Sequence, residues 1–171
     1  MSAATGTLEC RDATGADAPV LWQWHIDPET RSNSFGAAAG SYAEHVRWLE
    51  GRLVSPRSRL WIFTEHGRPI GQVRCDVDGD AGELSISVAP EARGRGYGKA
   101  MLTEACARAR TIWSRDLRLR GSVLGDNVRS QRLFAACGFR EVEREWRAGR
   151  HVVVFESTAS VGVGLHTKGQ R

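Results

Sequence analysis

Three glycines stand within five residues of the stretch EARGRGYGKAML, at positions 94, 96 and 98. Residues without a Cβ atom let successive main-chain N–H groups converge on one ligand. The apolar spacing that follows predicts a helix, whose N-terminus adds positive charge. The sequence therefore predicts an anion cradle for a pyrophosphate across Gly94–Gly98, with Arg93, Arg95 or Lys99 adding charge. The alternative is a flexible surface loop that is rich in glycine.

Two common phosphate-binding motifs do not fit this stretch. A dinucleotide fingerprint requires G-x-G-x-x-G directly after a strand, whereas the spacing here is G-x-G-x-G and residues 90–93 intervene. A Walker A loop requires a glycine where this chain has Arg93 and a hydroxyl residue where it has Ala100. We therefore expect the cradle to bind its anion without a metal ion.

Two motifs together resemble the GNAT superfamily of acyl-CoA-dependent N-acyltransferases. The first, Gln/Arg-x-x-Gly-x-Gly/Ala between a strand and a helix, stands here as Arg93 to Gly98 after the strand-like ELSISVAP. The second, Asn-x-x-(Ala/Ser)-x-x-Leu-(Tyr/Phe) followed by Gly-Phe, stands as Asn127, Ser130, Leu133–Phe134 and Gly138–Phe139. The resemblance implies an α/β (α+β) fold of GNAT type. Such a fold has a mixed, mostly antiparallel sheet of six or seven strands, about four helices, and a splay between the central strands.

The resemblance also implies that acetyl-CoA is the acetyl donor and that no metal takes part. Its pyrophosphate would lie on the main-chain amides of residues 93–99. Its pantetheine arm would run beside Ser87 and pair with that strand like an added strand, while Asn127 would hold the arm from the other side. The predicted coenzyme-binding residues are Val88, Ala89, Arg93, Gly94, Arg95, Gly96, Tyr97, Gly98, Lys99, Asn127, Ser130 and Phe134.

Acyl transfer to an amine requires a neutral amine, an oriented thioester, a donor to the developing oxyanion and a proton for the leaving thiolate. We predict Glu83 and Ser87 as the catalytic residues, with Glu83 acting as a base through water. The alternative for Glu83 is a solvated glutamate at a strand end. Many relatives carry a tyrosine that protonates the thiolate, at the position where this chain has Phe134. Cys137 or a water molecule would have to replace that tyrosine.

The N-terminal half resembles the acetyltransferases of nonulosonic (pseudaminic) acid biosynthesis, which acetylate an amine of a nucleotide-linked amino sugar. Their opening motif stands here in altered form as Trp24–Pro28, and their His-x-x-Trp pair as His45 and Trp48. Aromatic faces would stack on a sugar or base, and Arg31 or His45 would meet a diphosphate. The alternative for Trp24 and Trp48 is a place in the core. The predicted acceptor-binding residues are Trp24, His25, Arg31, Phe35, His45 and Trp48.

Two other functions stay open from the sequence. The branch of the superfamily that acetylates the N-terminus of ribosomal proteins shares the same opening helices and takes a peptide amine. A GNAT-fold module that binds acyl-CoA without catalysis is the second alternative, because the usual tyrosine is absent. Thiol release from acetyl-CoA, measured with amino sugars and with peptides, separates the three functions.

Length and composition set the outer limits. The 171 residues are 41% hydrophobic and 26% charged, and they predict one domain over residues 1–156 with a flexible tail over residues 157–171. The net charge of +4 comes from scattered arginines, and no motif that reads nucleic acid is present. No apolar run reaches the roughly 18 residues of a membrane helix, and no signal-peptide pattern opens the chain. We expect a cytoplasmic protein, monomeric or homodimeric, that binds a small-molecule amine and neither nucleic acid nor membrane.

The candidate residues require a strand–loop–helix unit at the centre of the chain. Alternation along ELSISVAP predicts a strand with Glu83 and Ser87 on one face and the apolar residues on the other. A helix over residues 97–113 follows the loop, and Ser41 with Glu44 forms a capping box that predicts another helix start. Around this unit we expect strands at TLECRDA and DLRLRGSV, helices at ADAPVLWQWHIDPE and NVRSQRLFAACG, a loop at RSNSFGAAAG, and hairpins at RLWIFTEHGRPIGQVRCDV and FREVEREWRAGRHVVVFES.

Overall fold

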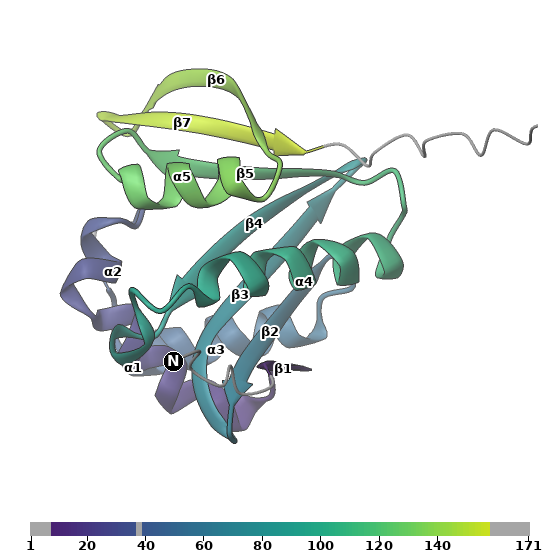
Figure 1. The fold of residues 1–171 in the computed structure, drawn as a ribbon. Helices are drawn as coiled ribbons and strands as arrows, with labels where there is room; N and C mark the ends of the chain where they lie inside the picture. The colour runs from purple at the N-terminus through teal and green to yellow at the C-terminus, as the bar shows by residue number, and fades with distance from the viewer. Residues whose placement is uncertain (1–7, 37–38, 158–171) are drawn as a thin grey trace, which may run out of the picture.

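The computed structural model describes residues 8–36 and 39–157, which form one mixed sheet with helices on both faces (Figure 1). The strand order is β1-β2-β3-β4-β5-β7-β6, and every neighbouring pair is antiparallel except β4 and β5. Two short 3-10 turns precede α1 and α4. The elements in chain order are β1 (Leu8–Asp12), α1 (Ala18–Ile26), α2 (Pro28–Ser32), α3 (Tyr42–Val54), β2 (Ser58–Glu65), β3 (Arg68–Asp78), β4 (Ala81–Val88), α4 (Tyr97–Ile112), β5 (Arg118–Leu124), α5 (Val128–Ala136), β6 (Arg140–Arg147) and β7 (Arg150–Ser157).

The seven-stranded mixed sheet confirms the predicted fold class. The described part has five α-helices, one more than predicted, because α2 forms where a loop was expected to begin. Asp27 caps this helix by accepting a hydrogen bond from the Thr30 N–H at 2.9 Å, and Pro28 takes its first position. At the other end of the chain, β7 runs to Ser157, and the rest of the predicted tail lies outside the described residues.

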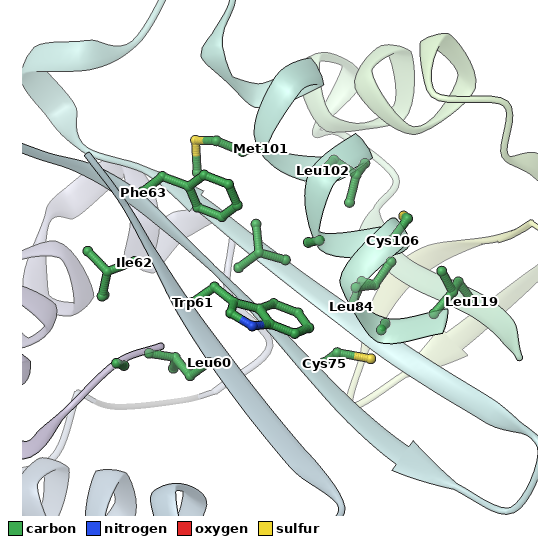
Figure 2. Close-up of a cluster of buried hydrophobic side chains, with 14 of the residues drawn as sticks. Leu60, Trp61, Ile62, Phe63, Cys75, Leu84, Met101, Leu102, Cys106 and Leu119 are labelled. Atoms are coloured by element: carbon green, nitrogen blue, oxygen red, sulfur yellow. The ribbon is translucent and has the colours of Figure 1, made fainter. Parts of the chain in front are cut away.

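Alternation along β2 divides the core into two apolar layers. Trp61 and Phe63 are fully buried on the side of α4, where Met101 and Leu102 close the layer (Figure 2). Their neighbours in β2 point to the opposite face, which α3 covers. The strand is therefore buried on both faces, and the central sheet gives the site between β4 and β5 a rigid frame.

The parallel strands β4 and β5 separate after a short stretch of pairing. Their register holds from Ala81 with Arg118 to Glu83 with Arg120, whereas β4 pairs with β3 along its whole length. Beyond Glu83, no described strand pairs with the β5 side of β4. Figure 1 shows the two strands opening toward α2. This splay confirms the predicted opening of the central strands, and it leaves main-chain groups of β4 available to an extended ligand.

Candidate active site

The loop between β4 and α4 has a backbone that glycine adopts most readily. Gly94 and Gly96 have φ angles of +75° and +83°, and Gly96 is the N-cap residue of α4. A Cβ atom added to either glycine would meet nothing within 4 Å, so the space beside this loop is open. Within the described residues, the N–H groups of Gly94, Arg95 and Gly96 have no hydrogen-bond acceptor. Open space, N–H donors without acceptors and a helix N-terminus are what a bound pyrophosphate requires.

The other members of the predicted cradle have different roles. Gly98 allows close packing, because a Cβ atom there would lie 3.2 Å from the side chain of Leu133 on α5. Tyr97 donates a hydrogen bond from its hydroxyl to Glu65, which is the main reason that its pKa is raised. The guanidinium of Arg95 lies over the Tyr97 ring at 5.5 Å. Arg95 and Lys99 are exposed, so both cations remain available to an anion at the loop.

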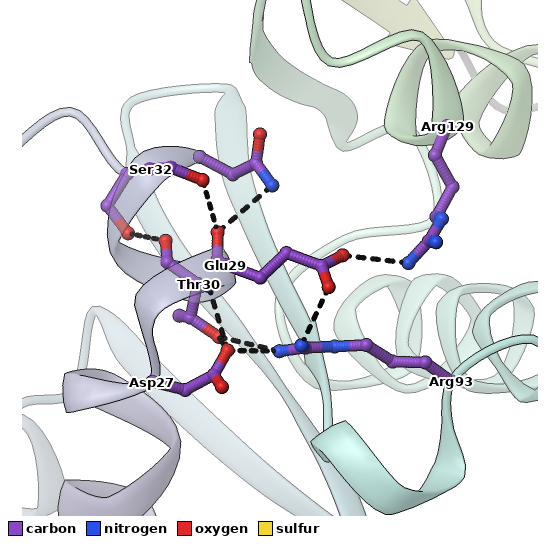
Figure 3. A network of polar contacts seen from close by, with 8 residues as sticks. Asp27, Glu29, Thr30, Ser32, Arg93 and Arg129 are labelled. Atoms are coloured by element: carbon purple, nitrogen blue, oxygen red, sulfur yellow. Dashed lines mark hydrogen bonds and ion pairs between the residues drawn. The ribbon is translucent and has the colours of Figure 1, made fainter.

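Arg93 differs from the other cations of the loop because its guanidinium is bonded to α2 (Figure 3). It donates to Asp27 at 2.6 Å, to Thr30 Oγ1 at 2.9 Å and to Glu29 at 3.0 Å, and its side chain is only 18% exposed. The hydrogen bond from Arg93 first, and then that from the Thr30 N–H, hold the pKa of Asp27 below its usual range. Of the three cations predicted to add charge for a pyrophosphate, Arg93 is the one whose guanidinium already has partners. Its guanidinium fixes α2 against the loop.

Glu83 lies at the apex of the splay, where pairing between β4 and β5 ends. Its Oε1 accepts a hydrogen bond from the Ser122 N–H at 2.9 Å, which fixes the carboxylate across the two strands. The side chain is exposed in a cavity of about 210 Å³ between β4 and the β6–β7 hairpin. Lining this cavity are Glu83, Arg120, Ser122, Glu143, Glu145, Arg147 and Val154.

The lining of this cavity contains more acidic than basic side chains. Glu145 pairs with Arg147, and Glu143 lies 3.8 Å from Arg120. Among the described residues no arginine, lysine or histidine pairs with Glu83. The carboxylate at the apex therefore gives the cavity a local negative charge that attracts an ammonium group.

The two residues predicted to be catalytic are not adjacent. Ser87 shares a face of β4 with Glu83 but lies four positions further along the strand, which places their Cα atoms about 13 Å apart. They therefore lie at different points, with Glu83 at the apex and Ser87 near the mouth of the splay. Ala89, just beyond the strand, is fully buried; its N–H bonds Ile70 O and its carbonyl accepts from Ala92 N. Both main-chain polar groups of Ala89, a predicted coenzyme contact, therefore already have partners within the protein.

Three of the six residues predicted to bind the acceptor, His25, His45 and Trp48, form a stacked column. The His45 ring stacks on His25 and on Trp48, with centroid distances of 5.5 Å in both pairs. The guanidinium of Arg74 lies 5.2 Å from the Trp48 ring centre, and that of Arg52 lies 5.9 Å away. Trp48 is therefore already covered by a ring and by two cations.

Three further residues from the same prediction lie in different surroundings. Trp24 is 4% exposed and belongs to the core, which corrects its assignment to the acceptor site. Arg31 lies in α2, not in the predicted loop, and donates to Gly36 O at 2.9 Å. Phe35 is 39% exposed and lies under the guanidinium of Arg147 at 5.5 Å, next to the cavity that contains Glu83. Of the six predicted residues, Phe35 has the best access to an acceptor.

His45 should make stability depend on pH. Burial first, and then the nearby His25, lower the pKa of His45, and within the described residues its buried Nε2 has no partner. The unfolded chain binds a proton near pH 6.5, whereas the folded protein disfavours that proton. The free energy of unfolding should therefore fall as pH decreases through this range. Urea unfolding at pH 8 and pH 5 should show that the free energy of unfolding decreases less for His45→Phe than for wild type. Equal decreases in the two proteins would contradict this role.

Comparison with known proteins decides the family. Residues 18–139 match the Acetyltransferase (GNAT) family, which is more than half of the chain. The chain belongs to this GNAT family. Its members transfer acetyl groups, and the chain is accordingly an acetyl-CoA-dependent N-acyltransferase. The comparison with curated proteins found no match.

Solved structures share the GNAT fold with this chain at low sequence identity. The spermidine N-acetyltransferase of Vibrio cholerae in complex with CoA and spermine is 19% identical, with a TM-score of 0.82 over 90% of this chain and 96% of that one. The putative acetyltransferase yncA of Salmonella typhimurium with acetyl-CoA is 17% identical, with a TM-score of 0.75 over 90% and 94%. Neither neighbour is named as an amino-sugar enzyme, so the finer resemblance in the sequence finds no support here.

The second GNAT motif forms α5 and the turn that precedes it. Asn127 caps the helix by accepting from the Ser130 N–H at 3.1 Å, and this leaves its NH2 group as a donor. Phe134 is 2% exposed and packs against Phe139 and Phe155, so it serves the core and not a ligand. A Cβ atom on Gly121 would lie 2.2 Å from the Phe134 ring, which shows how closely α5 packs on β5.

Two expected absences can be compared with the described part of the chain. Residues 8–36 and 39–157 contain no group of three or more His, Cys, Asp or Glu side chains that could hold a metal ion. None of the helices among them is both long and apolar enough to cross a membrane.

Cys137, the predicted substitute for the tyrosine, packs near α4 and donates to Lys99 O at 3.8 Å, while burial raises its pKa.

The site also contains residues that the sequence analysis missed. Glu143, Glu145 and Arg147 enter the cavity from β6, and Glu29 and Arg129 join α2 to α5. Glu29 and Arg129 are 100 positions apart in the chain, so no local pattern reveals the pair. The one local signal was Asp-Pro at the start of α2, which predicts a helix start.

Proposed function

We propose that this GNAT enzyme transfers an acetyl group from acetyl-CoA directly to a primary amine of a small, positively charged acceptor. One observation carries the proposal: the Glu83 carboxylate, held by the Ser122 N–H at 2.9 Å, lies at the apex of the β4–β5 splay in a cavity with an unpaired negative charge. A carboxylate in this place can attract an ammonium group and accept its proton.

The coenzyme fits the opposite end of the same splay. The N–H groups of Gly94, Arg95 and Gly96 would hold its pyrophosphate at the N-terminus of α4, and the open edge of β4 would pair with its amide-bearing arm. The NH2 group of Asn127 would bond the arm from the α5 side. When bound, acetyl-CoA supplies an activated thioester.

The chemistry assigned to the protein consists of positioning and one proton transfer. Alkyl amines are protonated near neutral pH, so the acceptor must lose a proton before it can attack a thioester. Glu83 would take this proton, directly or through water, while the cavity orients the amine. Binding both substrates in one splay removes much of the entropic barrier without a covalent enzyme intermediate. Because Phe134 is buried and has no hydroxyl, the leaving thiolate would take its proton from water.

A cationic acceptor agrees better with this site than a nucleotide-linked amino sugar. The rings predicted to stack on a sugar are buried or already covered, as Trp24 and Trp48 show. A neighbour of the same fold was solved with spermine, which is a polycation. The amino-sugar acceptor remains the second candidate, on the sequence resemblance of the segment Trp24–Pro28 and the pair His45 and Trp48.

An acceptor panel with acetyl-CoA tests the proposal. Thiol release should be fastest with alkyl diamines and polyamines such as spermidine, and about fivefold slower with neutral-bodied amines of equal length, because one further ammonium contact in an exposed cavity is worth about 1 kcal/mol. A nucleotide-linked 4-amino sugar and a peptide with a free N-terminus complete the panel. A higher kcat/KM for either of these would overturn the proposal. CoA binding without thiol release from any amine would indicate a non-catalytic module.

A further inference from the structure

Glu29 joins two arginines that reach it from opposite sides of the splay (Figure 3). Its Oε2 accepts from Arg93 at 3.0 Å, and its Oε1 accepts from Arg129 at 2.9 Å. Arg93 belongs to the loop that follows β4, and Arg129 belongs to the first turn of α5, which follows β5. One carboxylate on α2 therefore links the two segments that carry the predicted coenzyme contacts.

This link lies at the mouth of the splay. Because β4 and β5 are parallel, the segments that follow them leave the sheet at the same edge. Ligands of α/β sheets bind in the crevice outside the carboxyl ends of such strands, where the connections diverge. Arg93, Glu29 and Arg129 together span that crevice. A coenzyme whose phosphates rest on Gly94–Gly96 would enter beside this bridge.

The two arginines of the bridge are held very differently. The Arg93 side chain is 18% exposed and also bonds Asp27 and Thr30, so it stays in place without Glu29. The Arg129 side chain is 68% exposed, and Glu29 is its one ion-pair partner in the part of the chain that the structure describes. An exposed ion pair is worth at most about 1 kcal/mol. Arg129 can therefore exchange this partner for a stronger anion at little cost.

We propose that Arg129 is a further coenzyme-binding residue, which Glu29 holds across the mouth of the splay in the free protein and yields to a coenzyme phosphate. The inference rests on the proposed placement of the coenzyme. A phosphate carries more charge than a carboxylate and matches the planar guanidinium fork, so it competes well for Arg129. Glu29 keeps its bond to Arg93 after the exchange, and α2 stays attached to the coenzyme loop.

The test measures CoA binding by calorimetry, with no acceptor present, in two opposing variants. Glu29→Gln removes the competitor and should lower the Kd up to about fivefold, which is the worth of an exposed pair. Arg129→Met removes the phosphate contact and should raise the Kd about fivefold. Placing Glu29→Gln in the Arg129→Met background should abolish the gain, because no arginine is left to release.

Glu91→Gln is the matched control. Glu91 is exposed, lies two residues before Arg93, and has no hydrogen bond or ion pair among the described residues. It therefore reports the effect of removing one negative charge near the loop without freeing Arg129. A gain for Glu29→Gln no larger than that for Glu91→Gln would overturn the inference. A wild-type Kd for Arg129→Met, with an unchanged melting temperature, would overturn it as well.

Two further measurements sharpen the outcome. Dephospho-CoA lacks the 3′-phosphate. If Arg129 binds that phosphate, Arg129→Met should not change the Kd for dephospho-CoA, and if Arg129 binds the pyrophosphate, the variant should raise this Kd as it does for CoA. Both outcomes support the inference. Arg129→Lys keeps the charge and loses the fork, so it should bind with an intermediate Kd. If the wild-type protein binds no CoA, the proposed function itself is wrong. If it binds CoA normally and substitutions at Glu29 and Arg129 leave the Kd unchanged, only the further inference is wrong.

Discussion

Replacing Gly96 with valine should weaken CoA binding by about 100-fold, because several main-chain donors are misplaced together and each charge-assisted bond is worth more than 1 kcal/mol. Gly96 is the N-cap of α4 at φ +83°, a conformation that β-branched residues rarely adopt. The valine side chain would strain the loop or turn its N–H groups away. It would also fill the open space beside the loop, where the pyrophosphate is proposed to lie.

Gly79→Val is the control for backbone strain. Gly79 has φ +60° and equally open surroundings, but it lies in the turn between β3 and β4, at the opposite end of β4 from the loop. Both variants should lose about 1–3 kcal/mol of stability from the strained conformation. Calorimetry with CoA should show a wild-type Kd for Gly79→Val only. Equal Kd values for wild type and Gly96→Val would mean that the glycine loop does not bind the coenzyme.

The parts of the site that follow from local sequence were predicted well. The glycine loop, the helix after it and the two faces of ELSISVAP depend on neighbouring residues, so a short stretch is enough to predict them. The splay was expected from the family resemblance, and the pairing of β4 with β5 stops at Glu83, within the strand predicted to form its edge. Capping at Ser41 was similarly visible in the sequence, because a cap and the residue whose N–H it accepts lie three positions apart.

The errors arose where the partner of a residue lies far away in the chain. Arg93 was one of three cations predicted to add charge at the loop, and the sequence did not show that Asp27 and Glu29, more than 60 positions earlier, bind its guanidinium. Trp24 and Trp48 were predicted as stacking surfaces, and only the packing of α1 and α3 shows that their faces are covered. Charge and aromatic character are visible in a sequence, whereas the competition among partners for one side chain depends on tertiary structure.

Replacing Glu83 with glutamine should lower kcat about 100-fold near neutral pH, the usual contribution of a general base. Glutamine keeps a carbonyl oxygen that can accept the Ser122 N–H, so the link across the apex of the splay is retained. What the variant loses is the negative charge and the ability to accept a proton. Steady-state kinetics with the best amine of the panel, together with the Kd for CoA, would measure the effect. We expect an unchanged Kd.

The pH profile separates a lost base from a distorted cavity. If Glu83 accepts the proton of the ammonium group, the deficit of Glu83→Gln should shrink as the pH approaches about 10, where alkyl amines lose their proton without help. Glu143→Gln removes a carboxylate of the same cavity that already faces Arg120 at 3.8 Å, and should raise KM more than it lowers kcat. A deficit of Glu83→Gln that stays constant with pH, or an equal loss of kcat in Glu143→Gln, would mean that Glu83 attracts the acceptor without taking its proton.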